Sequence, residues 1–321
     1  MISTQQVQER RLDELLKRQL GPRILAAIAD PQITEIIVNE DGRLWFESYG
    51  SGMREAGLTL APSQVESLIG TVAASLGTVA NATNPIIEGE LPIAAIRFEG
   101  LLPPVARKPC CVMRKPAQVL YTLNDYVGHQ ILSEAHGDVL RSAIDQRRNI
   151  VIAGGTGSGK TTLAGALINE MVERSDRNER YVIIEDTLEI QCRAKNLAQL
   201  HTAEGADMTR LVRTTMRLRP DRIIIGEVRG AEALALLKAW NTGHPGGVTT
   251  IHANSGKAAL TRLSSLVQEA GVPPQPELIA ETINLVAFIV RSTKGRRVTE
   301  LVEVDGHDPR SGFRLRPIEL K

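Results

Sequence analysis

The chain has 321 residues, which gives room for about two domains and a full-sized hydrophobic core. Its formal net charge of +1 excludes a strong overall attraction to nucleic acid or to an acidic membrane surface. Its three cysteines, an odd number with two adjacent, argue for a reducing cytosol and against a disulfide framework, and the lack of a CxxC pair excludes a four-cysteine zinc site.

Residues 1–115 predict a small α+β domain. Leucines at helical spacing precede Gly21-Pro22, which predicts a helix that ends there and packs on its own domain rather than on a membrane or a partner. Apolar segments flank Asn39–Gly42 and predict a hairpin. A helix is predicted over 62–76 and short strands over 86–114.

The N-terminal region has no apolar stretch of the signal-peptide kind, and no window of the chain approaches the ~20 apolar residues of a membrane span. We therefore expect a soluble protein, and any membrane association would be peripheral. Residues 116–130 are predicted as an interdomain linker, because the segment 116–124 carries no predicted element.

Residues 131–321 alternate strands with helices, which predicts a mostly parallel, doubly wound sheet. The expected helices are 133–146, 160–172, 207–216, 231–239, 256–270 and 276–284. The expected strands are 150–153, 181–184, 222–225, 248–251, 285–290, 297–304 and 313–318.

The strand 150–153 runs directly into the P-loop pattern Gly154-x-x-x-x-Gly159-Lys160-Thr161, and a helix follows. Backbone N–H groups of such a loop and the positive helix N-terminus bind a triphosphate. A chance glycine turn would not need the strand before it and the helix after it. Lys160 is expected to reach the β- and γ-phosphates, and Thr161 to hold Mg²⁺. The predicted nucleotide-binding residues are Gly154, Gly155, Thr156, Gly157, Ser158, Gly159, Lys160, Thr161 and Thr162.

Polar side chains follow three further strands. Glu227 ends an apolar strand, where a carboxylate can orient and deprotonate the attacking water. Glu185, Asp186 and Glu189 follow another strand, and we assign Glu185 and Asp186 with Thr161 to Mg²⁺. A solvated turn is the alternative. His252 follows a fourth strand, and its place at this edge favours a functional role over a structural one. The pattern does not choose which carboxylate is the general base.

These motifs together resemble the secretion and pilus traffic ATPases, most closely the conjugal-transfer ATPases of type IV secretion. The resemblance covers most of the chain from about Arg97 on, and the first ~80 residues carry little of it. Walker B ends in Gly226-Glu227, as in that family, and lacks the Asp of many P-loop enzymes. The supporting segments are 97–104, 112–116, 154–162, 185–189, 213–222, 243–247 and 249–255.

The resemblance implies a RecA-like P-loop ATPase domain, an N-terminal domain that covers the nucleotide, and a homohexamer. It implies Mg²⁺-dependent ATP hydrolysis that powers pilus assembly and substrate transfer through a type IV secretion or conjugative DNA-transfer apparatus. The expected place is the cytoplasmic face of the inner membrane, with inner-membrane components of the machine as partners. The implied catalytic residues are Glu227, Glu189, His252, Arg114, Arg217 and Arg219.

Among these residues Arg114 matches a phosphate-contacting arginine of the family, and Arg217 and Arg219 match arginines near the γ-phosphate. The alternative is that Arg217, Arg219 and Arg222 are surface charges.

Three other functions compete with this interpretation. A type II secretion or pilus-retraction motor is one alternative: the missing four-cysteine zinc module counts against the type II secretion motor, and the linker and the context of Arg114 favour the conjugal type. A DNA-stimulated motor or helicase is disfavoured because the chain has no basic stripe, few aromatics and therefore no strong nucleic-acid signal. A nucleotide-gated scaffold without turnover is disfavoured by the carboxylates beside the P-loop.

Overall fold

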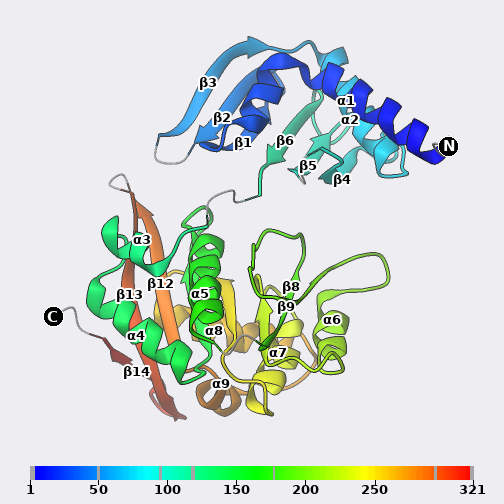
Figure 1. Ribbon diagram of the computed structural model, residues 1–321. Coiled ribbons are helices and arrows are strands. Elements are labelled where there is room, and N and C mark those ends of the chain that lie inside the picture. Colours follow the sequence, from blue (N-terminus) through cyan, green and yellow to red (C-terminus); the bar gives the residue numbers. More distant parts are fainter. Residues whose placement is uncertain are drawn as a thin grey trace. The chain divides into compact units, whose positions relative to one another are not determined.

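The computed structural model describes residues 4–48, 51–93, 96–116, 120–175, 178–292 and 295–318, with side chains from residue 10 on. It divides into two compact units, 1–119 and 120–321, and each is described here by itself (Figure 1). Among the described helices, none is long and apolar enough to cross a membrane.

In the N-terminal unit, the described strands form one antiparallel sheet in the order β3-β2-β1-β6-β5-β4. The predicted hairpin is β1 paired with β2. Helices α1 and α2 pack on one face of the sheet and bury its apolar residues in a single core. The elements are α1 (Thr4–Ala29), β1 (Ile33–Val38), β2 (Arg43–Ser48), β3 (Gly52–Thr59), α2 (Pro62–Ser75), β4 (Ile86–Leu91), β5 (Ile96–Leu101) and β6 (Cys110–Arg114).

Helix α1 differs from the prediction at Gly21-Pro22. The helix stops at Gly21, whose φ of 69° and ψ of 170° are not helical, but a second helical segment begins at once. Proline is favoured in the first turn of a helix, where its missing N–H would have no partner. Leu16 and Ile24, on either side of the kink, are both fully buried, so both segments pack on the same core.

The C-terminal unit is built on a sheet whose order among the described residues is β14-β13-β12-β7-β11-β10-β8-β9. Six neighbouring strands are parallel, namely β12, β7, β11, β10, β8 and β9. Strands β13 and β14 extend the sheet beyond β12 with antiparallel pairing. The elements are α3 (Leu123–Gly128), α4 (Glu134–Asp145), β7 (Ile150–Gly154), α5 (Lys160–Arg174), β8 (Arg180–Glu185), β9 (Asn196–His201), α6 (Met208–Thr215), β10 (Arg222–Ile225), α7 (Glu232–Asn241), β11 (Val248–His252), α8 (Gly256–Gln268), α9 (Pro276–Thr282), β12 (Leu285–Ser292), β13 (Gly295–Asp308) and β14 (Gly312–Pro317).

Both faces of this sheet are covered, as a doubly wound fold requires. In β7, Ile150 and Ile152 join a core with α3, α4 and α5, whereas Val151 and Ala153 join a core with the helices α6 to α9. This alternation follows from the two-residue period of a strand. Because every residue of β7 is buried, the strand is continuously apolar, which is the pattern that predicted it.

The predicted linker, 116–130, contains an element that the prediction missed. Helix α3 lies inside that range, and its Leu123 and Tyr126 are buried in the core of the C-terminal unit. The structure also adds β3 and β9, which the prediction left out. In β3, Ala56 is the one buried position of the strand, so the strand lacks the apolar alternation that would have marked it.

Candidate active site

The P-loop has the backbone that its glycines allow. Gly157 and Gly159 have φ values of 67° and 101°, which residues with a side chain rarely adopt. At Gly154 an added Cβ would lie 2.4 Å from the Ile289 carbonyl oxygen, so any side chain there would collide with β12. Gly159 precedes α5, and no side chain of the described residues caps this helix. Its first N–H groups therefore remain available to an anion.

Three predicted residues converge beside this helix end. Lys160 Nζ donates to the Gly155 carbonyl oxygen at 3.1 Å and lies 3.3 Å from His252 Nδ1. It also lies 3.9 Å from Glu227 Oε1, which is 3.0 Å from His252 Nε2. The lysine and glutamate side chains are only 8% and 17% exposed. The ends of β7, β10 and β11 thus bring a cation, a carboxylate and an imidazole together, as expected for neighbouring parallel strands.

The imidazole of His252 is held towards its neutral form. Burial lowers its pKa below the ordinary 6.5; Glu227 acts in the opposite direction, and Lys160 and Arg229 lower it further. A neutral imidazole can accept a hydrogen bond on one nitrogen and donate on the other. His252 is therefore suited to hydrogen-bonding beside Glu227 rather than to supplying a permanent charge.

Glu185 differs from the open metal ligand that the sequence predicted. The residue is 3% exposed, and its Oε1 accepts the backbone N–H groups of Glu189 and Ile190 at 3.1 and 3.0 Å. Burial raises its pKa to about 7, partly offset by these two hydrogen bonds. Glu185 therefore anchors the segment after β8 through Oε1, and its predicted role as a Mg²⁺ ligand stays a prediction. Glu189 contributes its backbone N–H to that anchor.

Asp186 remains the better placed of the two predicted metal carboxylates, since it is partly exposed and pairs with Arg229 at 3.4 Å. Among the described residues, no group of three His, Cys, Asp or Glu side chains could hold a metal ion. Mg²⁺ at triphosphates does not require one, because it is held by one or two protein oxygens, phosphates and waters. Thr161, in the first turn of α5, and Asp186 fit that donor set.

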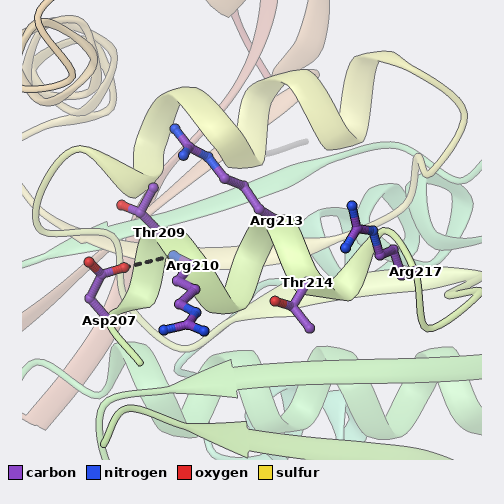
Figure 2. Close-up of a pocket in the computed structure, with 6 residues that line it drawn as sticks. All are labelled: Asp207, Thr209, Arg210, Arg213, Thr214 and Arg217. Atoms are coloured by element: carbon purple, nitrogen blue, oxygen red, sulfur yellow. Dashed lines mark hydrogen bonds between the residues drawn. The ribbon is translucent and has the colours of Figure 1, made fainter. Parts of the chain in front are cut away.

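Arg217 and Arg219 lie at the other end of the sheet within their own unit. They follow α6 and precede β10, and the carbonyl oxygen of Leu218 between them accepts from Arg180 Nε, at the start of β8, at 2.7 Å. Glu227 follows the far end of β10, roughly 13 Å along the strand. Arg217 also lines a hollow of about 380 Å³ on α6 with Arg210 and Arg213 (Figure 2).

Arg114 lies in the N-terminal unit, near the end of β6. Its Nε is 3.5 Å from Glu35 Oε1, and its side chain is 49% exposed. The predicted contact of Arg114 with phosphate stays a prediction.

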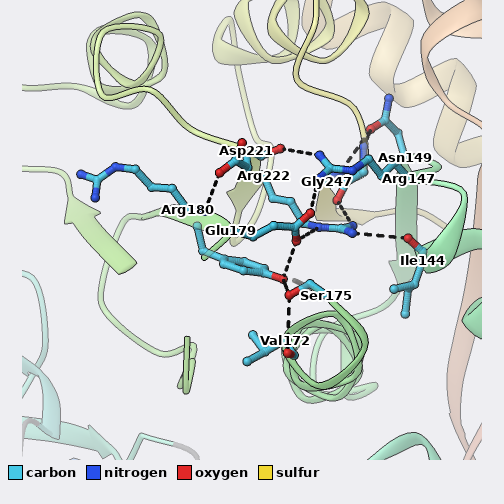
Figure 3. Close-up of polar contacts among 12 residues, drawn as sticks. Ile144, Arg147, Asn149, Val172, Ser175, Glu179, Arg180, Asp221, Arg222 and Gly247 are labelled. Carbon is cyan, nitrogen blue, oxygen red and sulfur yellow. Dashed lines mark hydrogen bonds and ion pairs between the residues drawn. The ribbon is translucent and has the colours of Figure 1, made fainter. Parts of the chain in front are cut away.

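The edge where β8 and β10 begin is built from mutually paired polar groups (Figure 3). Glu179 accepts from Arg147, from Arg222 Nε at 2.9 Å and from the Tyr181 hydroxyl at 3.0 Å. Arg222 also donates to the carbonyl oxygens of Gly246 and Ile144. The Arg222 and Glu179 side chains are 4% and 8% exposed, so this pair is a buried ion pair with its hydrogen bonds made.

Three arginines at the site were not predicted. Arg229 Nε and Nη2 both donate to Glu227 Oε2, at 2.8 and 2.5 Å. Arg291 and Arg296, paired across the β12–β13 hairpin, lie against the P-loop, with Arg291 Nη1 and Arg296 Cδ beside Gly157 and Gly159. Arg229 stands two residues after Glu227 and could have been found from that spacing. The hairpin arginines could not, because only the strand order brings β12 next to β7.

A parallel sheet wound on both faces, with a P-loop after its central strand, defines the RecA-like P-loop fold. The model of the family described as Type II/IV secretion system protein matches residues 86–309, and the chain belongs to this family. This confirms the family that the motifs predicted.

Two curated relatives and one solved structure place the chain further. The conjugal transfer protein TrbB of Rhizobium radiobacter is 51% identical over 297 residues, which cover 92% of this chain and 91% of that protein. The probable conjugal transfer protein TrbB of Sinorhizobium fredii is 50% identical over 295 residues, with 92% and 90% covered. The ATPase DotB of Legionella pneumophila is 22% identical with a TM-score of 0.62, covers 85% of this chain and 77% of its own, and shows the shared fold.

Proposed function

We propose that this chain is a Mg²⁺-dependent ATPase that powers a type IV secretion or conjugative DNA-transfer apparatus, and that it works as a homohexamer at the cytoplasmic face of the inner membrane. The observation that carries the proposal is the convergence of Lys160, Glu227 and His252 beside the N-terminus of α5. The high identity to conjugal transfer proteins over nearly the whole chain supports the biological setting.

The P-loop would bind the triphosphate. The first N–H groups of α5 and the Gly-rich backbone would face the β- and γ-phosphates, and Lys160 would turn from the Gly155 carbonyl oxygen to them. The Ser158 hydroxyl, buried and without a hydrogen-bond partner among the described residues, is a further donor for the same anion. These groups stabilise the negative charge that builds up as the γ-phosphoryl group is transferred.

Glu227 would act as the general base. Its Oε1 is buried, faces Lys160 and makes no hydrogen bond with the described residues, so it can accept one from the attacking water and then take its proton. Neutral His252, 3.0 Å away, would hold the carboxylate or the water in place. Thr161 and Asp186 would hold Mg²⁺, which would supply positive charge to offset the charge of the phosphates.

Three further arginines would complete the site, one from the N-terminal unit and two from a neighbouring copy of the chain. Arg114 is proposed to contact phosphate from the N-terminal unit. Arg217 and Arg219 are proposed to serve the nucleotide of a neighbouring copy, because they lie at the opposite end of the sheet from their own P-loop. A guanidinium aimed at the γ-phosphate is worth about 10³-fold or more in rate.

The proposal is tested by phosphate release and nucleotide binding with the purified chain. Lys160→Ala should lose both nucleotide affinity and turnover, and should abolish plasmid transfer in cells. Glu227→Gln should keep nucleotide affinity and lose about 10²- to 10⁴-fold in turnover, since an amide cannot take a proton. Arg114→Ala should lose more turnover than affinity if its contact strengthens in the transition state.

The matched control is Lys238→Ala, which removes an exposed lysine on α7 and should behave like the wild type. Wild-type turnover in Lys160→Ala would refute the ATPase proposal. A Glu227→Gln variant that binds nucleotide as poorly as Lys160→Ala would refute the role of Glu227 as the base.

A further inference from the structure

The two carboxylate oxygens of Glu227 stand in different surroundings. Oε2 accepts two N–H groups from Arg229, one from Nε at 2.8 Å and one from Nη2 at 2.5 Å. Oε1 lies 3.9 Å from Lys160 Nζ and 3.0 Å from His252 Nε2, and it is buried without a hydrogen bond of regular geometry from the described part of the chain. One oxygen is therefore held by Arg229, and the other faces the P-loop lysine and His252.

The backbone that carries Arg229 is fixed on both sides. The Val228 N–H donates to the Thr250 carbonyl oxygen at 2.9 Å, which ties the segment to β11. The N–H groups of Arg229 and Gly230 both donate to Glu232 Oε1, at 2.6 and 2.8 Å, and Glu232 is only 7% exposed. The guanidinium of Arg229 thus extends towards Glu227 from a rigid turn at the start of α7.

Arg229 also spans two strand ends. Its Nη1 lies 3.4 Å from Asp186 Oδ2, while its other nitrogens hold Glu227. Asp186 follows β8 and Glu227 follows β10, and like charges at neighbouring strand ends repel each other. A cation between the two carboxylates offsets this repulsion.

We infer that Arg229 is a positioning residue for hydrolysis: it holds Glu227 Oε2 so that Oε1 faces the place of the attacking water. The inference rests on the proposed function, in which Glu227 is the base. A carboxylate on a glutamate side chain rotates easily about its last bond, because the torsion has broad minima. Two N–H groups from one planar guanidinium remove that freedom, and a lysine ammonium does so less well.

The same geometry predicts that Arg229 matters for rate and little for folding. Its side chain is 55% exposed, and exposed ion pairs contribute little to stability. Removing the arginine should leave the binding of nucleotide by the P-loop intact, because its hydrogen bonds among the described residues run to Glu227, Asp186 and Glu232 and not to the P-loop. The loss should therefore appear in kcat, with KM and thermal midpoint nearly unchanged.

The test compares Arg229→Gln and Arg229→Lys with the wild type in the purified full chain. We expect Arg229→Gln to lower kcat by about 10- to 100-fold, the size of effect that a misplaced catalytic group causes. KM and nucleotide affinity should change by less than about threefold, and Arg229→Lys should recover part of kcat. The control is Arg174→Gln on α5. Arg174 also donates two hydrogen bonds to one carboxylate, that of Asp145 at the end of α4, and its loss should leave kcat at the wild-type value.

A double variant separates this inference from the proposed function. If Arg229 acts through Glu227, then Glu227→Gln combined with Arg229→Gln should be no slower than Glu227→Gln alone. A wild-type or raised kcat in Arg229→Gln, with Glu227→Gln inactive, would overturn the role of Arg229 and leave the proposed function standing. Full turnover in Glu227→Gln, or none in the wild type, would overturn both.

Discussion

Two groups of buried polar residues, at opposite ends of the strands of the C-terminal sheet, differ in whether their hydrogen bonds are made. Where β8 and β10 begin, Glu179 and Arg222 are nearly buried, and each has its hydrogen bonds made within the chain. Where β7, β8 and β10 end, the buried atoms Ser158 Oγ, Glu185 Oε2 and Glu227 Oε1 have no hydrogen-bond partner in the described residues.

Buried polar groups whose hydrogen bonds are all made stabilise the fold, whereas buried polar atoms without a partner are available to bind a ligand. A buried polar atom without a partner costs about 1–3 kcal/mol, so its presence asks for an explanation. Two of the three unpaired atoms, those of Ser158 and Glu227, lie beside the uncapped end of α5, where a triphosphate would supply donors and acceptors. Glu179 and Arg222 have no such demand, because their partners lie within the chain. Substitutions at the two edges should therefore have separable effects on activity and on stability.

The largest expected effect is the loss of turnover on replacing Arg217 and Arg219. Arg217 and Arg219 lie at the paired edge, yet we propose that they act on a nucleotide, and therefore on that of another copy. Replacing both by Ala should lower turnover about 10³-fold while nucleotide affinity is kept. Mixing this variant with Lys160→Ala should restore part of the turnover, because intact P-loops then meet intact arginines. A mixture with no recovered turnover would contradict action between copies.

The next effect is on folding. Arg222→Ala removes one partner of the buried pair and leaves Glu179 with Arg147 and Tyr181 alone. We expect a loss of about 3–5 kcal/mol in the free energy of unfolding, measured by urea denaturation. Arg147→Ala is the comparison, because its side chain is 40% exposed and should cost less. Under conditions where Arg222→Ala is folded, unchanged nucleotide affinity would support the division, and a selective loss of affinity would contradict it.

The smallest effect concerns Glu185, whose pKa is raised by burial from the ordinary 4.5 to about 7. Between these values the native chain binds more protons than the unfolded chain, so the free energy of unfolding falls as pH rises through this window. The full difference is about 3 kcal/mol, at 1.36 kcal/mol for each pKa unit. Glu185→Gln should remove this pH dependence from the nucleotide-free chain. Parallel stability curves for the variant and the wild type from pH 4.5 to 8 would show that Glu185 is ionised throughout.

The sequence predicted most of the parallel sheet because its strands are buried on both faces. Runs such as those of β7 and β10 are apolar at nearly every position, and the P-loop follows the first of them. It also predicted that Lys160, Glu227 and His252 would meet, because each follows a parallel strand at the same edge. These inferences needed no knowledge of long-range packing.

The misses have physical reasons as well. Helix α3 was hidden inside the predicted linker, although Thr122 and Asp125 form a capping box that the sequence displays. The turn of Glu185 towards the backbone of residues 189 and 190 could not be foreseen, because its burial depends on how the segment after β8 folds back. For the same kind of reason, periodicity cannot show that Arg296 lies against the P-loop.

The strand order has a consequence for how the protein is made. Strand β7 has neighbours in the sheet that come much later in the chain, since Ile150 is in register with both Val248 and Leu285. A ribosome adds about 5–20 residues per second, so roughly 5–20 s pass between the synthesis of β7 and the synthesis of its partner β11. A chain truncated before β12 would leave one side of the P-loop strand without its partner. The nucleotide site is thus among the last parts of the fold to be completed during translation.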